Sequence, residues 1–436
     1  MDNIVLKKKA LTMLSIIILL FSACADVPEN VKNKKQGQED KVELGSRVTV
    51  DRLLEGAEDV SAYIKEKGYE GKFVLDSDVH IELPEKLYEL ETETVSEAYR
   101  HYPEIYSELF GRDFWEDSGA KDFSELPRYS EHINEPGYYF IDITSAGDGV
   151  IYSEGGTDSS DLLKRLTLTS GGFLFYSHDT HIVTGEINEM IKAGGREIPD
   201  KKIRMADEKD HTLGELTSAA NEQLNSIYGK ITDSYEFRVG KLCPYYDNDI
   251  CSALYIEVEK CYKGVPFCNQ LISEYAEEGR RQYAPVYTAM IDETQKITGL
   301  ESPFGIDKVI SEKELSDGLV SLAEAFDIMN NELAPKIKLN ISEIRLCYMC
   351  DYDSADVDAA LSANRESLTR EQSTAAFDPT LTPGRKYRAY PVWEFIMDKN
   401  IPDSKGNYRM KEICDIITVD AQTGKLTNYI DKVSQR

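Results

Sequence analysis

Basic residues are scarce in this chain of 436 residues. Its 50 lysines and arginines stand against 78 aspartates and glutamates, so the formal net charge is −28. A protein that binds nucleic acid presents a basic face to the phosphates, and no basic stripe occurs here. The composition therefore argues against nucleic acid as a partner. The hydrophobic content of 41% is typical of a folded protein with a soluble, acidic surface.

The motifs of common catalytic centres are also lacking. The chain has six histidines and no HExxH, no GxSxG, no P-loop and no GxGxxG. The sequence therefore predicts no catalytic, cofactor-binding or metal-binding residue, and it favours a protein that is not an enzyme. A triad or carboxylate pair scattered along the chain stays open, because 78 acidic residues offer many pairings.

An apolar run of 12 residues, Ala10 to Phe21, follows three lysines at positions 7–9. The run is short for a membrane span and is typical of a signal peptide. It ends in Phe-Ser-Ala-Cys at 21–24, which resembles the lipobox of bacterial lipoproteins, although Phe21 replaces the usual Leu.

The lipobox resemblance implies that residues 1–23 are removed and that Cys24 carries a diacylglyceryl group. Two acyl chains, of the palmitate type, would anchor the protein stably to the extracytoplasmic face of the cell membrane. A secretory signal cleaved without lipidation is the alternative. We expect a lipidated tether over 24–68, because residues 25–46 are polar and have no periodicity.

Eight cysteines occur, and an odd number remains if Cys24 is lipidated, which argues against a complete disulfide framework. Cys347 and Cys350 form a Cys-x-x-Cys, but on a strand residues three apart face opposite ways, so neither a redox pair nor a disulfide between them is expected. A pairing with Cys414 on another strand stays open. The widely spaced cysteines could bind zinc, form one or two disulfides or remain free buried thiols, and free thiols are favoured; they are Cys243, Cys251, Cys261 and Cys268.

Three further groups have a functional and an ordinary interpretation. Acids at 351, 353, 356 and 358 lack the spacing of a calcium loop, so residues 351–376 are interpreted as a solvated acidic linker. His178, Asp179 and His181 could bind zinc, but a polar strand edge is favoured. Tyrosines could line a recognition surface, although covering sheet faces is the preferred interpretation; they are Tyr88, Tyr99, Tyr102, Tyr106, Tyr245, Tyr246, Tyr387 and Tyr390.

Alternating and helical patterns together predict an α+β fold of antiparallel sheets, each packed by a helix. Alternating runs broken by Gly-rich turns predict a β-rich domain over 69–205. A helix is expected over 212–231, and a second helical pattern starts near 311. Strands follow each helix, which suggests two units, 206–310 and 311–436.

The two units align at an offset of 104 residues. Leu216 then falls on Val320, and Lys241-Leu242-Cys243 falls on Arg345-Leu346-Cys347. Identity is weak but residue class agrees, which indicates an internal duplication. Cys347 belongs to the repeated pattern, whereas the position equivalent to Cys350 is Tyr246.

The C-terminal segments "YRAYPVWEFIM" and "ICDIITVDAQTGKL" resemble PepSY-like modules, as does the arrangement of two copies with "KGVPF" at 263–267. The resemblance also extends to the extracytoplasmic accessory proteins of WalK-type sensor kinases in Gram-positive bacteria and to an uncharacterised family of clostridial lipoproteins. It implies a hairpin turn at 419–424, in which Asp and Thr side chains bind the backbone and Gly takes a positive φ. It also implies a non-catalytic surface protein that binds or regulates an extracytoplasmic protein, sensor, peptide or wall component. A surface hydrolase acting on peptide or glycan is the alternative.

Overall fold

The structure is a computed structural model, and it is described here for part of the chain. The described residues are 47–75, 81, 83–122, 125, 140–146, 149–151, 162–169, 174–178, 186–187, 191–192, 200–247, 250–268, 280–283, 287–302, 306–333, 338–353, 384, 386–397 and 415–429. The predicted signal peptide, the lipidation site Cys24 and residues 25–46 lie outside them. None of the helices in this part of the chain is long and apolar enough to span a bilayer.

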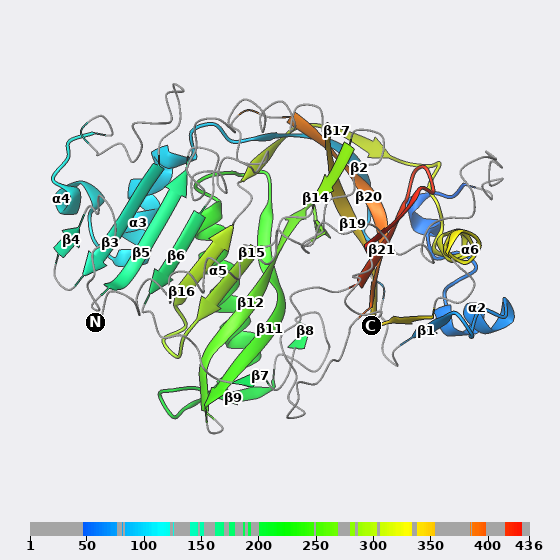
Figure 1. Ribbon diagram of the computed structural model, residues 1–436, viewed down its shortest axis with the longest axis horizontal. Helices are drawn as coiled ribbons and strands as arrows, with labels where there is room; N and C mark the ends of the chain where they lie inside the picture. The colour runs from blue at the N-terminus through cyan, green and yellow to red at the C-terminus, as the bar shows by residue number, and fades with distance from the viewer. Residues whose placement is uncertain are drawn as a thin grey trace, which may run out of the picture.

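Two large antiparallel sheets lie side by side (Figure 1). The first has eleven described strands. Its main path runs β4 (Gly149–Ile151), β3 (Phe140–Ala146), β5 (Leu162–Thr169), β6 (Leu174–His178), β16 (Ile297–Ser302), β15 (Tyr287–Ile291), β12 (Ile250–Tyr262), β11 (Glu236–Asp247) and β7 (Glu186–Ile187). Two short strands complete it: β13 (Val265–Pro266) pairs with β12, and β8 (Ile191–Lys192) pairs with β11.

The second large sheet has seven described strands. Its path runs β14 (Arg280–Tyr283), β19 (Glu343–Asp353), β20 (Lys386–Met397), β2 (Leu87–Thr94) and β17 (Asp307–Leu315), and β21 (Asp415–Asp420) joins β20 to β22 (Leu426–Tyr429). Two small two-stranded sheets accompany the large ones, β1 (Phe73–Leu75) with β18 (Leu339–Ile341) and β9 (Lys202–Arg204) with β10 (Asp210–Thr212). Strands dominate, and helices pack beside them, so the predicted α+β class is confirmed.

Helix α5 (Leu213–Tyr228) begins at a capping box, in which Thr212 and Glu215 each bind the other's backbone N–H. Its apolar residues recur at helical spacing and are buried. Asn225 holds the helix to the first sheet, because its side chain donates to the carbonyl of Phe237 at 2.6 Å and accepts from the N–H of Phe237 at 2.9 Å. The predicted helix over 212–231 is therefore confirmed to within three residues at its end.

Helix α6 (Leu322–Glu332) is shorter than its sequence pattern indicates. Residues 311–315, which the sequence analysis placed in this helical segment, belong to strand β17 instead. Ser321 caps the helix by accepting from the N–H of Glu324. Phe326 then packs on the second sheet, with its ring 5.2 Å from that of Phe395 on β20.

Each helix is followed by four strands that pair in chain order, with other strands between them. After α5, the strands β11, β12, β15 and β16 are each antiparallel to the next, while β13 and β14 intervene and β14 joins the second sheet. After α6 and β18, the strands β19, β20, β21 and β22 are each antiparallel to the next. Leu242 and Leu346, which the offset aligns, occupy corresponding places: Leu242 lies opposite Ile256, and Leu346 lies opposite Trp393.

The hairpin turns that join the last two strands of each series also share their chemistry. Asp420 accepts from the N–H groups of Gln422 and Thr423 at 2.7 and 2.9 Å, and Gly424 takes a φ of 75°. This confirms the predicted turn at 419–424. Between β15 and β16, Asp292 likewise accepts from the N–H of Thr294 at 2.9 Å.

The predicted tether over 24–68 needs correction from residue 47 onward. Residues 50–52 form the short helix η1 (Val50–Arg52), and α2 (Val60–Glu66) begins at Asp59, whose side chain accepts from the N–H of Ala62. Leu53 and Ala57 are fully buried in the main core. This segment therefore packs as part of the folded protein, because its few apolar residues all face the same core.

The sheets draw their strands from more than one of the predicted domains. Strand β2 comes from the region 69–205, yet it pairs with β17 and β20 of the second sheet. The remaining helical elements of that region, η2 (Ala98–His101), α3 (Tyr102–Phe110) and α4 (Phe114–Ser118), lie beside the first sheet (Figure 1). There the hydroxyl of Tyr102 donates to the carbonyl of Leu166 on β5 at 3.1 Å.

Candidate functional site

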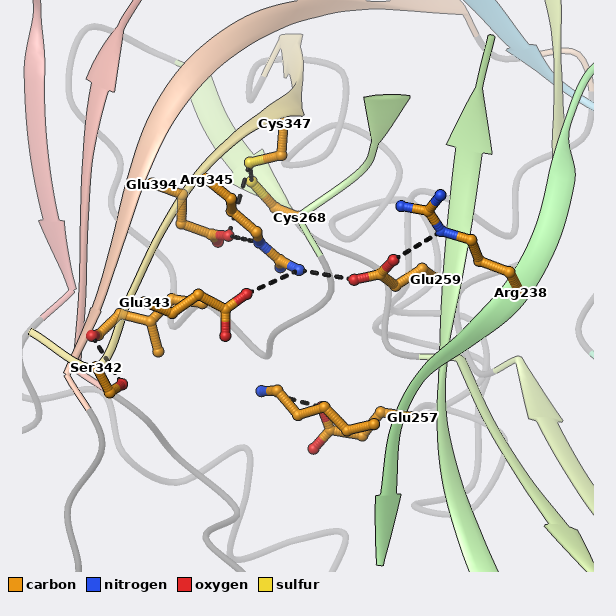
Figure 2. A network of polar contacts seen from close by, with 11 residues as sticks. Arg238, Glu257, Glu259, Cys268, Ser342, Glu343, Arg345, Cys347 and Glu394 are labelled. Atoms are coloured by element: carbon orange, nitrogen blue, oxygen red, sulfur yellow. Dashed lines mark hydrogen bonds and ion pairs between the residues drawn. The ribbon is translucent and has the colours of Figure 1, made fainter. Parts of the chain in front are cut away.

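Charged side chains meet where strands β11 and β12 of the first sheet face β19 and β20 of the second (Figure 2). Arg345 on β19 lies at their centre. Its Nε donates to Glu394, the residue directly opposite on β20, and its other nitrogen donates to Glu259 on β12 at 3.0 Å. Glu343 approaches the same guanidinium at 3.9 Å. One arginine therefore joins carboxylates from both sheets.

A second arginine extends this network into the first sheet. Arg238 on β11 lies opposite Glu259 and donates to its second oxygen at 3.0 Å. The order Arg238–Glu259–Arg345–Glu394 thus alternates in charge across the junction. Alternation of this kind offsets the cost of removing each charge from water.

A similar ion pair occurs in the first sheet. Lys241 aligns with Arg345 at the offset of 104 residues. Lys241 lies opposite Glu257 on the neighbouring strand and pairs with it at 3.3 Å, as Arg345 pairs with Glu394. In both cases the cation and the carboxylate lie opposite each other on neighbouring strands, and the two pairs lie on the same junction.

The burial of Arg345 and Glu394 determines the electrostatics of this network. The side chain of Glu394 has no exposed surface, and that of Arg345 is 14% exposed. Burial by itself would lower the pKa of the Arg345 guanidinium, but Glu394, Glu343 and Glu259 outweigh it and raise that pKa well above its ordinary value. The arginine is therefore charged at every physiological pH.

Two thiols lie against this ion pair. The sulfur atoms of Cys268, just after β13, and Cys347, on β19, are 2.9 Å apart. Cys347 also donates to Oε2 of Glu394 at 3.6 Å. Burial raises the pKa of both thiols, and for Cys268 the contact with Cys347 adds to the effect. Both are therefore neutral thiols at physiological pH, which disfavours them as nucleophiles.

The two cysteines of the Cys-x-x-Cys motif lie in different clusters, as expected for residues three apart on a strand. Cys347 lies in a small apolar cluster with Cys268, Met349, Tyr390, Val392 and Ile416, whereas Cys350 lies in the main core. The two residues thus face opposite sides of β19, and the prediction that they do not pair with each other is confirmed. Strand β19 continues to Asp353, so residues 351–353 of the predicted linker over 351–376 belong to the sheet. Residues 356 and 358 lie outside the described part.

The other predicted candidates are dispersed or lie outside the described residues. Cys243, Cys251 and Cys261 are buried free cysteines, and among the described residues only Cys268 of that group joins a cluster able to hold a metal. His178 ends strand β6, while Asp179, His181 and Cys414 are not described. Of the tyrosines, Tyr88, Tyr102, Tyr106 and Tyr390 are buried; Tyr88 and Tyr390 lie on strands, whereas Tyr102 and Tyr106 lie on helix α3. Tyr245, Tyr246 and Tyr387 are partly exposed, and the side chain of Tyr99 is not described.

A second buried ion pair joins the same two sheets. Lys260 on β12 binds Asp307 on β17 at 2.7 Å, and both side chains are almost fully buried. The hydroxyl of Tyr235 donates to the other oxygen of Asp307 at 3.0 Å, and the ammonium lies 4.1 Å from the ring centre of Phe267. Each oxygen of this carboxylate has a partner, so the pair is a structural link rather than a reactive group.

The sequence analysis missed the Arg345–Glu394–Cys268 arrangement, although one signal was present. Glu394 stands within "AYPVWEFIM", an otherwise apolar run on a strand whose neighbours are buried. A glutamate in such a run is rarely buried unless it has a charged partner. Its partners come from β19 and from the segment after β13, and the sequence does not reveal which strands pair.

Comparisons with known proteins add little to this description. No protein-family model matches the chain, and no curated protein matches it. A solved structure of an uncharacterized protein from Eubacterium rectale is similar, at 13% sequence identity and a TM-score of 0.42, over 83% of this chain and 91% of that one. Similarity at this level supports no statement about function.

Proposed function

We propose that this protein is a non-catalytic lipoprotein, anchored through Cys24 on the extracytoplasmic face of the cell membrane, which binds or regulates another extracytoplasmic protein, a peptide or a wall component. The observation that carries the proposal is the doubled unit. After both α5 and α6, four strands pair antiparallel in chain order, with β13, β14 and β18 as additional strands, and a helix paired with an antiparallel sheet is what the resemblance to PepSY-like modules implies.

Two details support the PepSY-like part of the proposal. The turn after β21 has the Asp–Thr–Gly chemistry on which the sequence resemblance rests, and the turn after β15 has the same Asp-centred hydrogen bonding. In both pairs, Lys241–Glu257 and Arg345–Glu394, the cation and the carboxylate lie opposite each other on neighbouring strands. Shared turns and shared cross-strand pairs favour duplication of one module over a chance likeness of strand order.

The charged groups at the junction favour a structural role over a catalytic one. Arg345, Glu259 and Arg238 bind one another in alternation, and the thiols beside them are neutral at physiological pH. A hydrolase needs a nucleophile and a base that converge on open space. The proposed activity is therefore recognition by the outer faces or edges of the sheets.

Anchoring is tested first, because localisation limits the possible partners. We expect the full chain to take up an alkyne-labelled fatty acid and to fractionate with membranes, and Cys24→Ala to lose both properties. Cys414→Ala serves as the matched control, since it also removes one cysteine. Equal labelling of the Cys24→Ala chain would contradict lipidation at that residue.

Binding is then tested with residues 47–436, which contain every described element. This soluble form is immobilised and exposed to detergent-solubilised membranes and wall fragments of the source cells, with the same form unfolded by heat as the control. We expect one component to be enriched repeatedly over the control and, when tagged in turn, to recover this protein. No enrichment by either route would contradict the binding role, and turnover of a wall peptide or glycan would contradict its non-catalytic character.

A further inference from the structure

Three potential ligand atoms converge at the junction of the two sheets. The sulfurs of Cys268 and Cys347 and a carboxylate oxygen of Glu394 all lie within 4.8 Å of one another. All three side chains are buried, and they come from three separate segments (Figure 2). Thiolates with a carboxylate form a donor set that suits Zn²⁺ and similar soft or borderline divalent cations.

Glu394 supplies a second, independent observation. Its Oε2 accepts from Arg345 and from Cys347, whereas its Oε1 is buried and has no hydrogen-bond partner among the described residues. A buried oxygen left unpaired keeps the cost of its removal from water, so such atoms normally have a partner. By contrast, Asp307, the other buried carboxylate of the junction, has a partner for each oxygen.

We propose that Cys268, Cys347 and Glu394 form a binding site for one Zn²⁺-like divalent cation, which links the two sheets. The cation forms two metal–sulfur bonds and one bond to Oε1 of Glu394, and the two thiol protons leave to solvent. Three protein ligands leave the fourth position of a tetrahedral site for a water molecule.

The charges at the junction are compatible with replacing two thiol protons by one divalent cation. The cation brings two positive charges and the departing protons remove two, so the net charge of the buried centre does not change. With the cation bound, two thiolates and one carboxylate exceed its charge by one, and the Arg345 guanidinium on Oε2 offsets that excess. The centre therefore holds the ion without burying an uncompensated charge.

A disulfide between Cys268 and Cys347 is the competing use of the same sulfurs. The separation of 2.9 Å lies between a disulfide bond of about 2.05 Å and the ~3.8 Å expected between two sulfurs on a tetrahedral Zn²⁺. Distance alone does not choose between them. Either state removes the Cys347 proton that Glu394 accepts, but a disulfide would leave Oε1 unpaired, whereas a cation bound to that oxygen would give it a partner. Glu394 therefore favours the cation.

The proposal is tested on the full chain, purified in detergent under reducing conditions. After chelation and buffer exchange, the protein is titrated with Co²⁺ and, separately, with Zn²⁺. We expect one equivalent of Co²⁺ to produce a thiolate-to-cobalt charge-transfer band and tetrahedral visible bands, and one equivalent of Zn²⁺ to abolish them. We also expect Zn²⁺ to protect two thiols from alkylation, with Cys268 and Cys347 identified by peptide mapping.

Variants separate this site from the other buried thiols. Cys268→Ser and Glu394→Gln should each weaken Zn²⁺ binding at least tenfold, and the charge-transfer band should fall to about half in Cys268→Ser. Cys350→Ala is the matched control, because it removes a buried cysteine from the opposite face of the same strand, and it should bind as the wild type does. Absence of the cobalt bands in the wild-type protein, or bands that Cys268→Ser leaves unchanged, would overturn the proposal. A protein isolated from its cells two hydrogens lighter, with a mapped Cys268–Cys347 bridge, would overturn it in favour of the disulfide.

Discussion

Loss of the Arg345 side chain should destabilise the protein strongly. Replacing it by Met keeps most of the side-chain volume but leaves Glu394, which has no exposed surface, without a charged partner. Removing one member of a buried ion pair costs about 3–5 kcal/mol. Glu259 adds little to that cost, because it retains Arg238 at 3.0 Å. The expected loss is thus a large share of the ~5–15 kcal/mol that stabilises a typical domain.

Replacing Glu394 instead of Arg345 should lower the free energy of unfolding by less, and the difference tests the reasoning. In Glu394→Gln, Arg345 keeps its 3.0 Å bond to Glu259, so we expect a loss of about 1–3 kcal/mol. The double variant Arg345→Met/Glu394→Leu leaves no unpaired buried charge, and it should recover at least half of what Arg345→Met loses. Lys86→Met is the control, because Lys86 forms an exposed ion pair with Glu314, and its removal should leave the free energy of unfolding almost unchanged.

Trp393 provides the assay. The chain has two tryptophans, and Trp393 is fully buried next to Glu394, with its indole N–H donating to the carbonyl of Val320 at 2.9 Å. Urea unfolding is followed by fluorescence in a Trp115→Phe background, with chelator and reductant present so that neither metal nor disulfide contributes. The reasoning is refuted if Arg345→Met unfolds within about 1 kcal/mol of the parent, or if the double variant is no more stable than Arg345→Met.

Three further predictions follow from local features. Burial raises the pKa of Cys251 to about 11, so the folded state holds this proton more tightly than the unfolded chain. The free energy of unfolding should therefore fall as pH rises above ~8.5, by at most about 1.4 kcal/mol per pH unit for this thiol. Thermal melts from pH 7 to pH 10 in reductant should show a shallower fall in Cys251→Ala than in the parent. Thr212→Ala should cost about 1 kcal/mol in urea unfolding by removing the cap of α5, and an unchanged midpoint would contradict that role. Gly424→Ala should cost about 1 kcal/mol, because its φ of 75° strains any residue with a Cβ, whereas a neutral result would show that the turn relaxes.

The sequence predicted the local parts of the fold with good success. The apolar spacing of α5 lies within 16 consecutive residues, and the turn at 419–424 depends on hydrogen bonds between neighbours. The alternation of side chains along a strand is enough to predict that Cys347 and Cys350 face opposite ways. The failures came where pairing with distant strands overrode local pattern. Residues 311–315 look helical with the segment that follows, yet β17 forms because β2, more than 200 residues earlier, offers a partner.

The candidate site lies beyond what any local pattern decides. Apolar spacing determined the α+β class, since it depends on periodicity along the chain, and the offset of 104 residues suggested the doubled unit. Glu394 could be recognised as an unusual acid in an apolar strand, but its environment could not. Only the tertiary structure places Arg345 opposite it, Glu259 across the junction, and Cys268 against Cys347, a pair separated by 79 positions. Whether a buried acid is an ion-pair partner, a metal ligand or both depends on atoms brought together from distant segments, and those contacts exist only once the two sheets have packed.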